Sequence, residues 1–249
     1  MAGAVLIAVG TGIAGAADLP VKTAPLYVPA PFTWTGCYFG GNFGGAWDNT
    51  NWSDTLLGVN WSNGNSNGLG LIGGGEAGCN YQMGAFVVGV EGDFDWAAKN
   101  HSSNNAVVGP TGDSFQLTSN NYWISTVAAR FGFAVERALL YGKVGGGWVG
   151  TNGFTVTDVT TGASFSSANS NTLGGWLVGA GVEYAYTTTW TMKLEYDYLG
   201  LGSQSVTLPG TVIPALAGDT FNSGHRNVQM VKLGVNYLFN WGGPVVARY

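Results

Sequence analysis

The amino-acid sequence predicts an all-β fold, an eight-stranded antiparallel up-and-down transmembrane β-barrel. Apolar and polar side chains alternate with a period of two, most clearly over 190–198, where Lys193, Glu195 and Asp197 stand between aromatic and aliphatic residues. Long and short connections between such segments also alternate, as extracellular loops and periplasmic turns do in an outer-membrane barrel. Charged residues make up only 9% of the chain, yet it contains no apolar run of the about 20 residues that a membrane helix needs.

The composition favours strands and excludes one class of partner. The chain holds 42 Gly, 10 Trp, 11 Tyr and 12 Phe, a set of backbone-permissive and interfacial residues that rarely builds surface helices. Its net charge is -5 and no basic cluster is present, so we expect no nucleic-acid binding.

The chain divides into four segments. Residues 1–17 are apolar and end in Ala14-Gly15-Ala16-Ala17, which predicts a secretory signal peptide; because the first basic residue is Lys22, we expect the printed start to lie inside a longer signal. Residues 18–32 contain four prolines and are expected to form an extended periplasmic lead-in. The barrel occupies 33–239, and 240–249 form a C-terminal tail.

Eight segments carry the strand pattern. Four connections rich in Asn, Ser, Thr and Gly, at 48–67, 97–119, 151–172 and 202–224, are expected to be long extracellular loops. Short turns are expected at 83–84, 136–137 and 187–189. The expected strands are 33–47, 69–82, 86–96, 122–134, 139–148, 173–186, 190–198 and 228–239.

The charged positions of these strands fall on one face. An Arg or Lys facing lipid at the bilayer midplane costs about 2–4 kcal/mol, so the charged face is expected to point into the barrel. A soluble barrel with an apolar interior explains the same alternation, but its rings would overfill an eight-stranded lumen. Glycines at 73–75 and 145–147 are expected to relieve crowding there. The expected lumen charges are Glu76, Glu91, Asp93, Asp95, Arg130, Lys143, Glu183, Lys193, Glu195, Asp197 and Lys232.

Two roles are open for these charges. They could line a conducting lumen, which the excess of acids would make cation-preferring. They could instead form an ion-paired plug, and eight strands leave so little room for water that we favour the plug.

Four segments resemble a known family. Trp-Thr-Gly-Cys-Tyr-Phe-Gly-Gly-Asn at 34–42, Leu-Tyr-Gly-Lys at 140–143, Gly-Ala-Gly-Val-Glu-Tyr at 179–184 and Lys-Leu-Gly-Val-Asn-Tyr-Leu-Phe at 232–239 resemble the small outer-membrane β-barrel proteins of alphaproteobacteria. These are the rhizobial and Brucella-type outer-membrane immunogenic proteins, often filed as porin-family. The resemblance implies an OmpA/OmpX-like barrel in the cell outer membrane, exposed loops and no catalysis. It also implies that Tyr237, Phe239 and the final Tyr249 form the ending read by the outer-membrane assembly machinery.

The two cysteines are expected to form a disulfide. Cys37 and Cys79 lie in strands that should be antiparallel neighbours, and both fall on the outward-facing set. The periplasm is oxidising and an even cysteine count leaves no spare thiol. Two unpaired thiols facing lipid are the alternative.

No catalytic, cofactor or metal site is predicted. His101 and His225 fall in predicted loops without spaced cysteine or carboxylate partners, which is weak support for a metal site. Asp113, Asp158 and Asp219 lie in loops too, so an enzyme with its site at the barrel rim stays an alternative.

We expect a non-enzymatic surface protein that contributes to envelope structure and to recognition or adhesion. Its expected partners are outer-membrane lipid, the assembly machinery and an extracellular ligand that the sequence does not identify. A small porin passing ions or small solutes is the first alternative.

Overall fold

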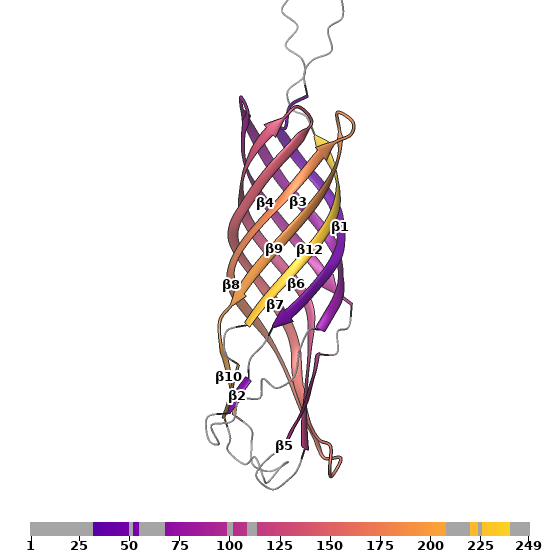
Figure 1. The fold of residues 1–249 in the computed structure, drawn as a ribbon, viewed down its shortest axis with the longest axis vertical. Coiled ribbons are helices and arrows are strands. Elements are labelled where there is room, and N and C mark those ends of the chain that lie inside the picture. Colours follow the sequence, from indigo (N-terminus) through magenta and orange to yellow (C-terminus); the bar gives the residue numbers. More distant parts are fainter. Residues whose placement is uncertain are drawn as a thin grey trace, which may run out of the picture. The chain divides into compact units, whose positions relative to one another are not determined.

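The computed structural model describes residues 32–49, 52–54, 68–98, 102–108, 114–207, 220–223 and 226–239. Eight of the strands in these ranges close into one antiparallel barrel, each bonded to the next barrel strand along the chain (Figure 1). The pairing of β12 with β1 closes the ring. The barrel strands are β1 (Gly36–Asn49), β3 (Gly68–Met83), β4 (Phe86–Ala97), β6 (Ser114–Val135), β7 (Ala138–Asp158), β8 (Ser164–Ala185), β9 (Trp190–Leu201) and β12 (Arg226–Phe239).

The predicted fold is therefore confirmed, and each expected strand overlaps a barrel strand. The short connections gather at one end of the barrel and the long hairpins at the other (Figure 1). By the rule for outer-membrane barrels, the first end is periplasmic and the second extracellular.

Two of the expected extracellular loops are largely strand, which corrects the prediction. β6, β7 and β8 have 22, 21 and 22 residues, against 12 in β4 and in β9. A tilted strand crosses the bilayer in about 9–11 residues, so roughly half of each of these three strands lies beyond it. The expected loop 151–172 is the end of a β7–β8 hairpin, and 97–119 contains β5 (Ser102–Val108) and the start of β6. These parts are rich in Ser, Thr and Asn, a composition that is typical of loops.

The other two expected loops contribute a second, smaller sheet. Its three strands are β2 (Trp52–Asp54), β10 (Gln204–Thr207) and β11 (Thr220–Ser223), in the order β10-β11-β2. The first and last long connections along the chain therefore pair with each other, as neighbours in a closed ring can.

The signal peptide, all of the lead-in except Phe32, and the tail 240–249 lie outside the described residues. Within the described ranges, no helix has the length and apolar character required to span a membrane.

Glycine is sterically required at inward positions of the glycine-rich strands. A Cβ at Gly74 would collide with the carbonyl oxygen of Phe94, and one at Gly145 would collide with that of Val127. The adjacent Gly73 and Gly75 differ, because a Cβ there would make only ordinary contacts of 3.6 Å. Crowding therefore explains Gly74 and Gly145, which face the lumen, but not Gly73 and Gly75, which face outward.

Candidate functional site

The outer wall of the barrel carries two belts of aromatic side chains. Near the periplasmic end, the ring of Trp190 lies 5.2 Å from that of Tyr237; near the extracellular end, Trp176 lies 5.3 Å from Tyr198. Trp190 and Tyr198 are eight residues apart on β9, which is about 20 Å along the barrel axis at ~3.3 Å per residue and ~40° tilt. Paired belts at this spacing are those of a barrel that spans a bilayer.

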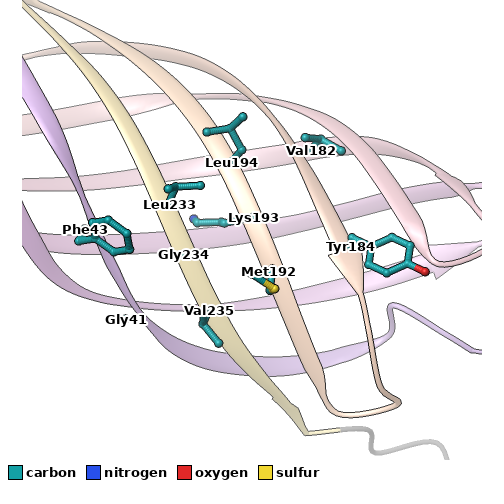
Figure 2. Close-up of a pocket in the computed structure, with 10 residues that line it drawn as sticks. All are labelled: Gly41, Phe43, Val182, Tyr184, Met192, Lys193, Leu194, Leu233, Gly234 and Val235. Carbon is teal, nitrogen blue, oxygen red and sulfur yellow. The ribbon is translucent and has the colours of Figure 1, made fainter.

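Between the belts the wall is apolar. One hollow on it has a volume of about 340 Å³ and crosses β1, β12, β9 and β8 (Figure 2). It lies beside Gly41 on β1, which has no side chain to fill it. Its walls are Phe43, Val182, Tyr184, Met192, Leu194, Leu233 and Val235, and Lys193 contributes to its floor.

Inside the barrel, the structure places all eleven charges of the predicted set together. None is more than 4% exposed. They come from seven strands, β3, β4, β6, β7, β8, β9 and β12, and occupy the middle of the barrel's length. The pattern of alternation therefore identified the buried charged layer residue by residue.

Arg130 is the centre of the periplasmic half of this layer. Its guanidinium group donates to Glu91 on β4 at 3.1 Å and to Glu183 on β8 at 2.8 Å. It also donates to the hydroxyl of Tyr38 on β1, and its Cζ lies 3.9 Å from the ring centroid of Tyr141 on β7. One side chain thus connects β6 to four other strands.

Three lysines serve the remaining carboxylates, and each contacts several. Lys193 lies closest to Glu76, with 2.7 Å between nitrogen and oxygen. Lys193 Nζ also lies 3.2 Å from an oxygen of Glu91 and 3.4 Å from one of Glu195. Lys143 Nζ lies 3.3 Å from Glu91, 3.5 Å from Asp93, 2.8 Å from Glu195 and 3.1 Å from Asp197. Lys232 Nζ lies 3.0 Å from Asp93, 3.8 Å from Asp95, 3.2 Å from Glu195 and 3.0 Å from Asp197.

Three carboxylates of the layer are close enough together to hold a metal ion. One oxygen each from Glu91, Asp93 and Glu195 lie within 4.8 Å of one another. The Nζ of Lys143 lies 2.8–3.5 Å from an oxygen of each. The protein therefore supplies its own cation to this cluster.

Sequence reasoning missed two apolar layers that enclose the charged one. The same inward-facing positions that carry charges in mid-strand carry aliphatic side chains toward the strand ends, as on β9, where Leu199 and Leu201 follow Asp197. The extracellular layer consists of Ala46, Ile72, Ile124, Ala128, Val149, Leu177, Leu199, Leu201, Val228 and Met230, all at most 7% exposed. The continued two-residue period could have identified it.

The periplasmic layer is built around a residue that precedes the first strand. Trp34 is 1% exposed and packs with Val87, Leu139, Tyr141 and Ala185. The predicted strand 33–47 included it, but β1 begins at Gly36. The side chain of Gln82 on β3 holds the segment, because its Oε1 accepts a 2.8 Å hydrogen bond from the backbone N–H of Trp34.

The predicted disulfide is present. Cys37 on β1 and Cys79 on β3 are directly opposed, with 3.9 Å between their Cα atoms and a separation of 42 positions in the sequence. They lie near the periplasmic end on the outward side of the sheet, beside Phe39 and Tyr81.

The remaining predicted residues are only partly within the described ranges. Tyr237 and Phe239 lie at the end of β12, with ring centroids 5.0 Å apart, whereas Tyr249 is outside the described residues. His101, His225, Asp113 and Asp219 are outside them too. Asp158 caps the β7–β8 turn, where its carboxylate accepts hydrogen bonds from the backbone N–H groups of Thr160 and Thr161 and from the Thr161 hydroxyl.

Comparison with known proteins gives the same architecture. The family model described as "Outer membrane protein beta-barrel domain" matches residues 5–239. The chain is 31% identical over 243 residues to the 31 kDa outer-membrane immunogenic protein of Brucella melitensis, covering 90% of this chain and 92% of the relative. It is 31% identical over 163 residues to the 22 kDa outer membrane protein of Rhizobium leguminosarum, covering 65% and 63%.

Among solved structures, the outer membrane protein OprG of Pseudomonas aeruginosa matches with a TM-score of 0.49 and 13% identity, over 83% of this chain and 97% of that one. The family model covers nearly the whole chain, and the Brucella relative matches it along almost its full length. The chain therefore belongs to the outer-membrane β-barrel protein family and is a protein of the cell outer membrane.

Proposed function

We propose that this protein is a closed, non-enzymatic barrel that holds long hairpins at the cell surface and conducts neither ions nor small solutes. The observation that carries the proposal is the enclosure of the charged layer between two apolar layers. An ion crossing this interior would leave water and separate buried pairs, and breaking such a pair costs about 3–5 kcal/mol. The sealed interior supports the structural role over that of a porin.

The charged layer then has a mechanical role inside the wall. Around the ring, each barrel strand is hydrogen-bonded to the barrel strand on either side, but the ion pairs join strands that are not adjacent, such as β6 to β8 through Arg130 and Glu183. Pairs of this kind hold the cross-section in one shape, because any other shape would leave buried charges unpaired.

The role at the surface rests on the hairpins that project from the barrel. The paired ends of β6, β7 and β8 form a hydrogen-bonded sheet beyond the extracellular aromatic belt. The Brucella relative is named an immunogenic protein, and that name supports exposure of such parts to antibodies. We propose that these hairpins contribute to recognition or adhesion by an extracellular partner.

The outer wall supports a further role in envelope structure. Its apolar band would contact hydrocarbon chains of the membrane, and the hollow beside Gly41 would be filled by one of them. The end of β12 would be the part that the assembly machinery recognises.

Solute flux through liposomes tests the proposal. Vesicles that contain the folded chain should swell in isosmotic small sugars no faster than empty vesicles, while vesicles with a general porin swell rapidly. Swelling that rises with the amount of this protein would favour the porin alternative. An epitope inserted after Thr161, at the tip of the β7–β8 hairpin, should be labelled on intact cells; labelling only after lysis would contradict the surface role.

A further inference from the structure

The sealed charged layer contains more acids than bases. Its eleven members are seven carboxylates and four cationic side chains, a formal charge of three negatives. Among the interior side chains that the structure describes, one more is charged, Arg226. It lies six residues from Lys232 on β12, about 20 Å along the strand, with Val228 and Met230 of the extracellular apolar layer between them. Arg226 is therefore too far along the barrel to neutralise the negative charge of the layer.

The hydrogen bonds divide the seven carboxylates into two groups. Four of them, Glu91, Asp93, Glu183 and Glu195, receive a hydrogen bond on both oxygens. The donors include all four cations, the hydroxyls of Tyr38, Thr126, Tyr141 and Thr191, and the Asn236 amide. Four fully bonded carboxylates thus match four cations in number.

The other three carboxylates are Glu76, Asp95 and Asp197. Oε1 of Glu76 and both oxygens of the two aspartates are buried without a well-aligned hydrogen bond. Lys193 lies 2.7 Å from the other oxygen of Glu76, and Oδ2 of Asp197 lies 3.0 Å from Lys232 and 3.1 Å from Lys143. Asp95 has its nearest cation, Lys232, at 3.8 Å. Asp197 shares Lys143 and Lys232 with better-bonded carboxylates. The layer has three more carboxylates than cations, and three of its carboxyls are incompletely hydrogen-bonded, so the two counts agree.

We propose that Glu76, Asp95 and Asp197 bind protons in the folded barrel and are neutral acids at physiological pH. Seven buried carboxylates share four cations, and a buried negative charge in excess of the available cations is costly, so the usual outcome is neutralisation. Protonation also turns the carboxyl into a donor. A protonated Glu76 then has a neighbour that can accept its hydrogen bond. The side-chain nitrogen of Asn42 lies 3.3 Å from Oε2 of Glu76, and the Oδ1 of the same amide is buried without a hydrogen-bond donor.

Other buried titratable groups surround these three acids. They are Tyr38 on β1; Glu91 and Asp93 on β4; Arg130 on β6; Tyr141 and Lys143 on β7; Glu183 on β8; Lys193 and Glu195 on β9; and Lys232 on β12.

Proton uptake fixes the direction of the pH dependence. In the unfolded chain the three carboxyls are solvated and ionised at neutral pH, so the folded barrel binds more protons than the unfolded chain. Stability then falls as the pH rises, until the folded barrel releases these protons. A bound metal cation would give a different result, because stability would depend on the concentration of that cation and not on the loss of protons.

The direct test is infrared spectroscopy of the folded full chain in detergent at neutral pH. We expect a carbonyl band of neutral carboxylic acids, which decreases in each of E76Q, D95N and D197N and disappears in the triple variant. The matched variants E91Q and E195Q should leave it unchanged. Absence of the band from the unsubstituted protein would overturn the proposal, and that measurement needs no variant to fold.

Thermal unfolding gives an independent readout. The triple amide variant should keep or raise the midpoint of the unsubstituted protein at neutral pH, whereas E91Q and E195Q should lower theirs. In mildly alkaline buffer the unsubstituted protein should lose stability and the triple variant should not. A midpoint that rises with added sodium, potassium or magnesium, or a triple variant less stable than the parent, would contradict the proposal. Neither result depends on whether the barrel conducts.

Discussion

Lys232 on the last barrel strand donates a 3.0 Å hydrogen bond to Asp93 on β4, 139 residues earlier in the chain. In the sheet, β1 and β3 lie between these two strands, so the pair crosses the interior and does not follow the wall. It forms only when the barrel is closed, because β12 completes the ring by pairing with β1.

Replacing Lys232 by methionine should therefore destabilise the barrel strongly. The change keeps most of the side-chain volume but leaves Asp93, Glu195 and Asp197 with one cation fewer in a buried layer. We expect a loss of about 3–5 kcal/mol in the free energy of unfolding, measured by urea titration of the folded band on unheated gels. R137Q, which changes an exposed turn residue, should cost less than about 1 kcal/mol. Equal losses in the two variants would mean that the buried pairs have no special role.

The disulfide should stabilise the start of the barrel. It closes a loop of 42 residues, which corresponds to about 4 kcal/mol in the chain-entropy model. The C37S/C79S double variant should unfold at lower urea by that amount, and a reductant should affect the parent and not the variant. Thiol titration of the denatured, unreduced parent should find no free thiols; two per chain would contradict the bond.

The alternation of side chains and of connection lengths was sufficient to predict the barrel and its buried charges. The disulfide also required the even cysteine count and the oxidising compartment. Charges such as Lys193, Glu195 and Asp197 contrast with their neighbours at every second position, so one strand defines both faces. Leu199 and Leu201 continue the inward face, but the sequence does not distinguish them from lipid-facing residues, because an aliphatic side chain is stable both in lipid and in a protein core. The extracellular halves of β6 to β8 could not be recognised, because Ser, Thr and Asn are compatible with both loop and strand.

The turn of the β7–β8 hairpin should respond to acid. The hydrogen bond from the Thr161 hydroxyl, with those from the backbone N–H groups of Thr161 and Thr160, lowers the pKa of the Asp158 carboxyl. A lowered pKa in the folded state means that the turn is stabilised above the ordinary pKa of about 3.9 and loses this contribution as the pH falls through the folded value. NMR titration of the Thr160 and Thr161 amides in micelles should show this transition.

Two variants check the assignment of that transition. D158N should abolish it, and T161V, which removes the hydroxyl donor, should move its midpoint up toward the ordinary value. An unchanged titration in T161V would show that the hydroxyl does not set the acidity of Asp158.

The end of the chain should control assembly. Tyr237 and Phe239 pack against Phe39 on the outer wall, with ring centroids 6.2 and 5.4 Å apart. We predict that deletion of 241–249, which removes Tyr249, lowers the amount of folded protein in the outer membrane, measured by fractionation and gel mobility without heating. F239S should lower it as well. Normal levels after the deletion, with low levels in F239S, would show that β12 alone supplies the signal.

Single-channel recording in planar bilayers tests the closed interior most directly. The folded chain, inserted from detergent beside a general porin as positive control, should give no conductance steps in concentrated potassium chloride, because apolar layers cover both ends of the charged interior. The W34A variant should also stay silent, since the extracellular layer and the ion pairs remain. Regular steps from the unsubstituted protein, proportional to salt concentration and selective for cations, would contradict this account and identify the barrel as a porin.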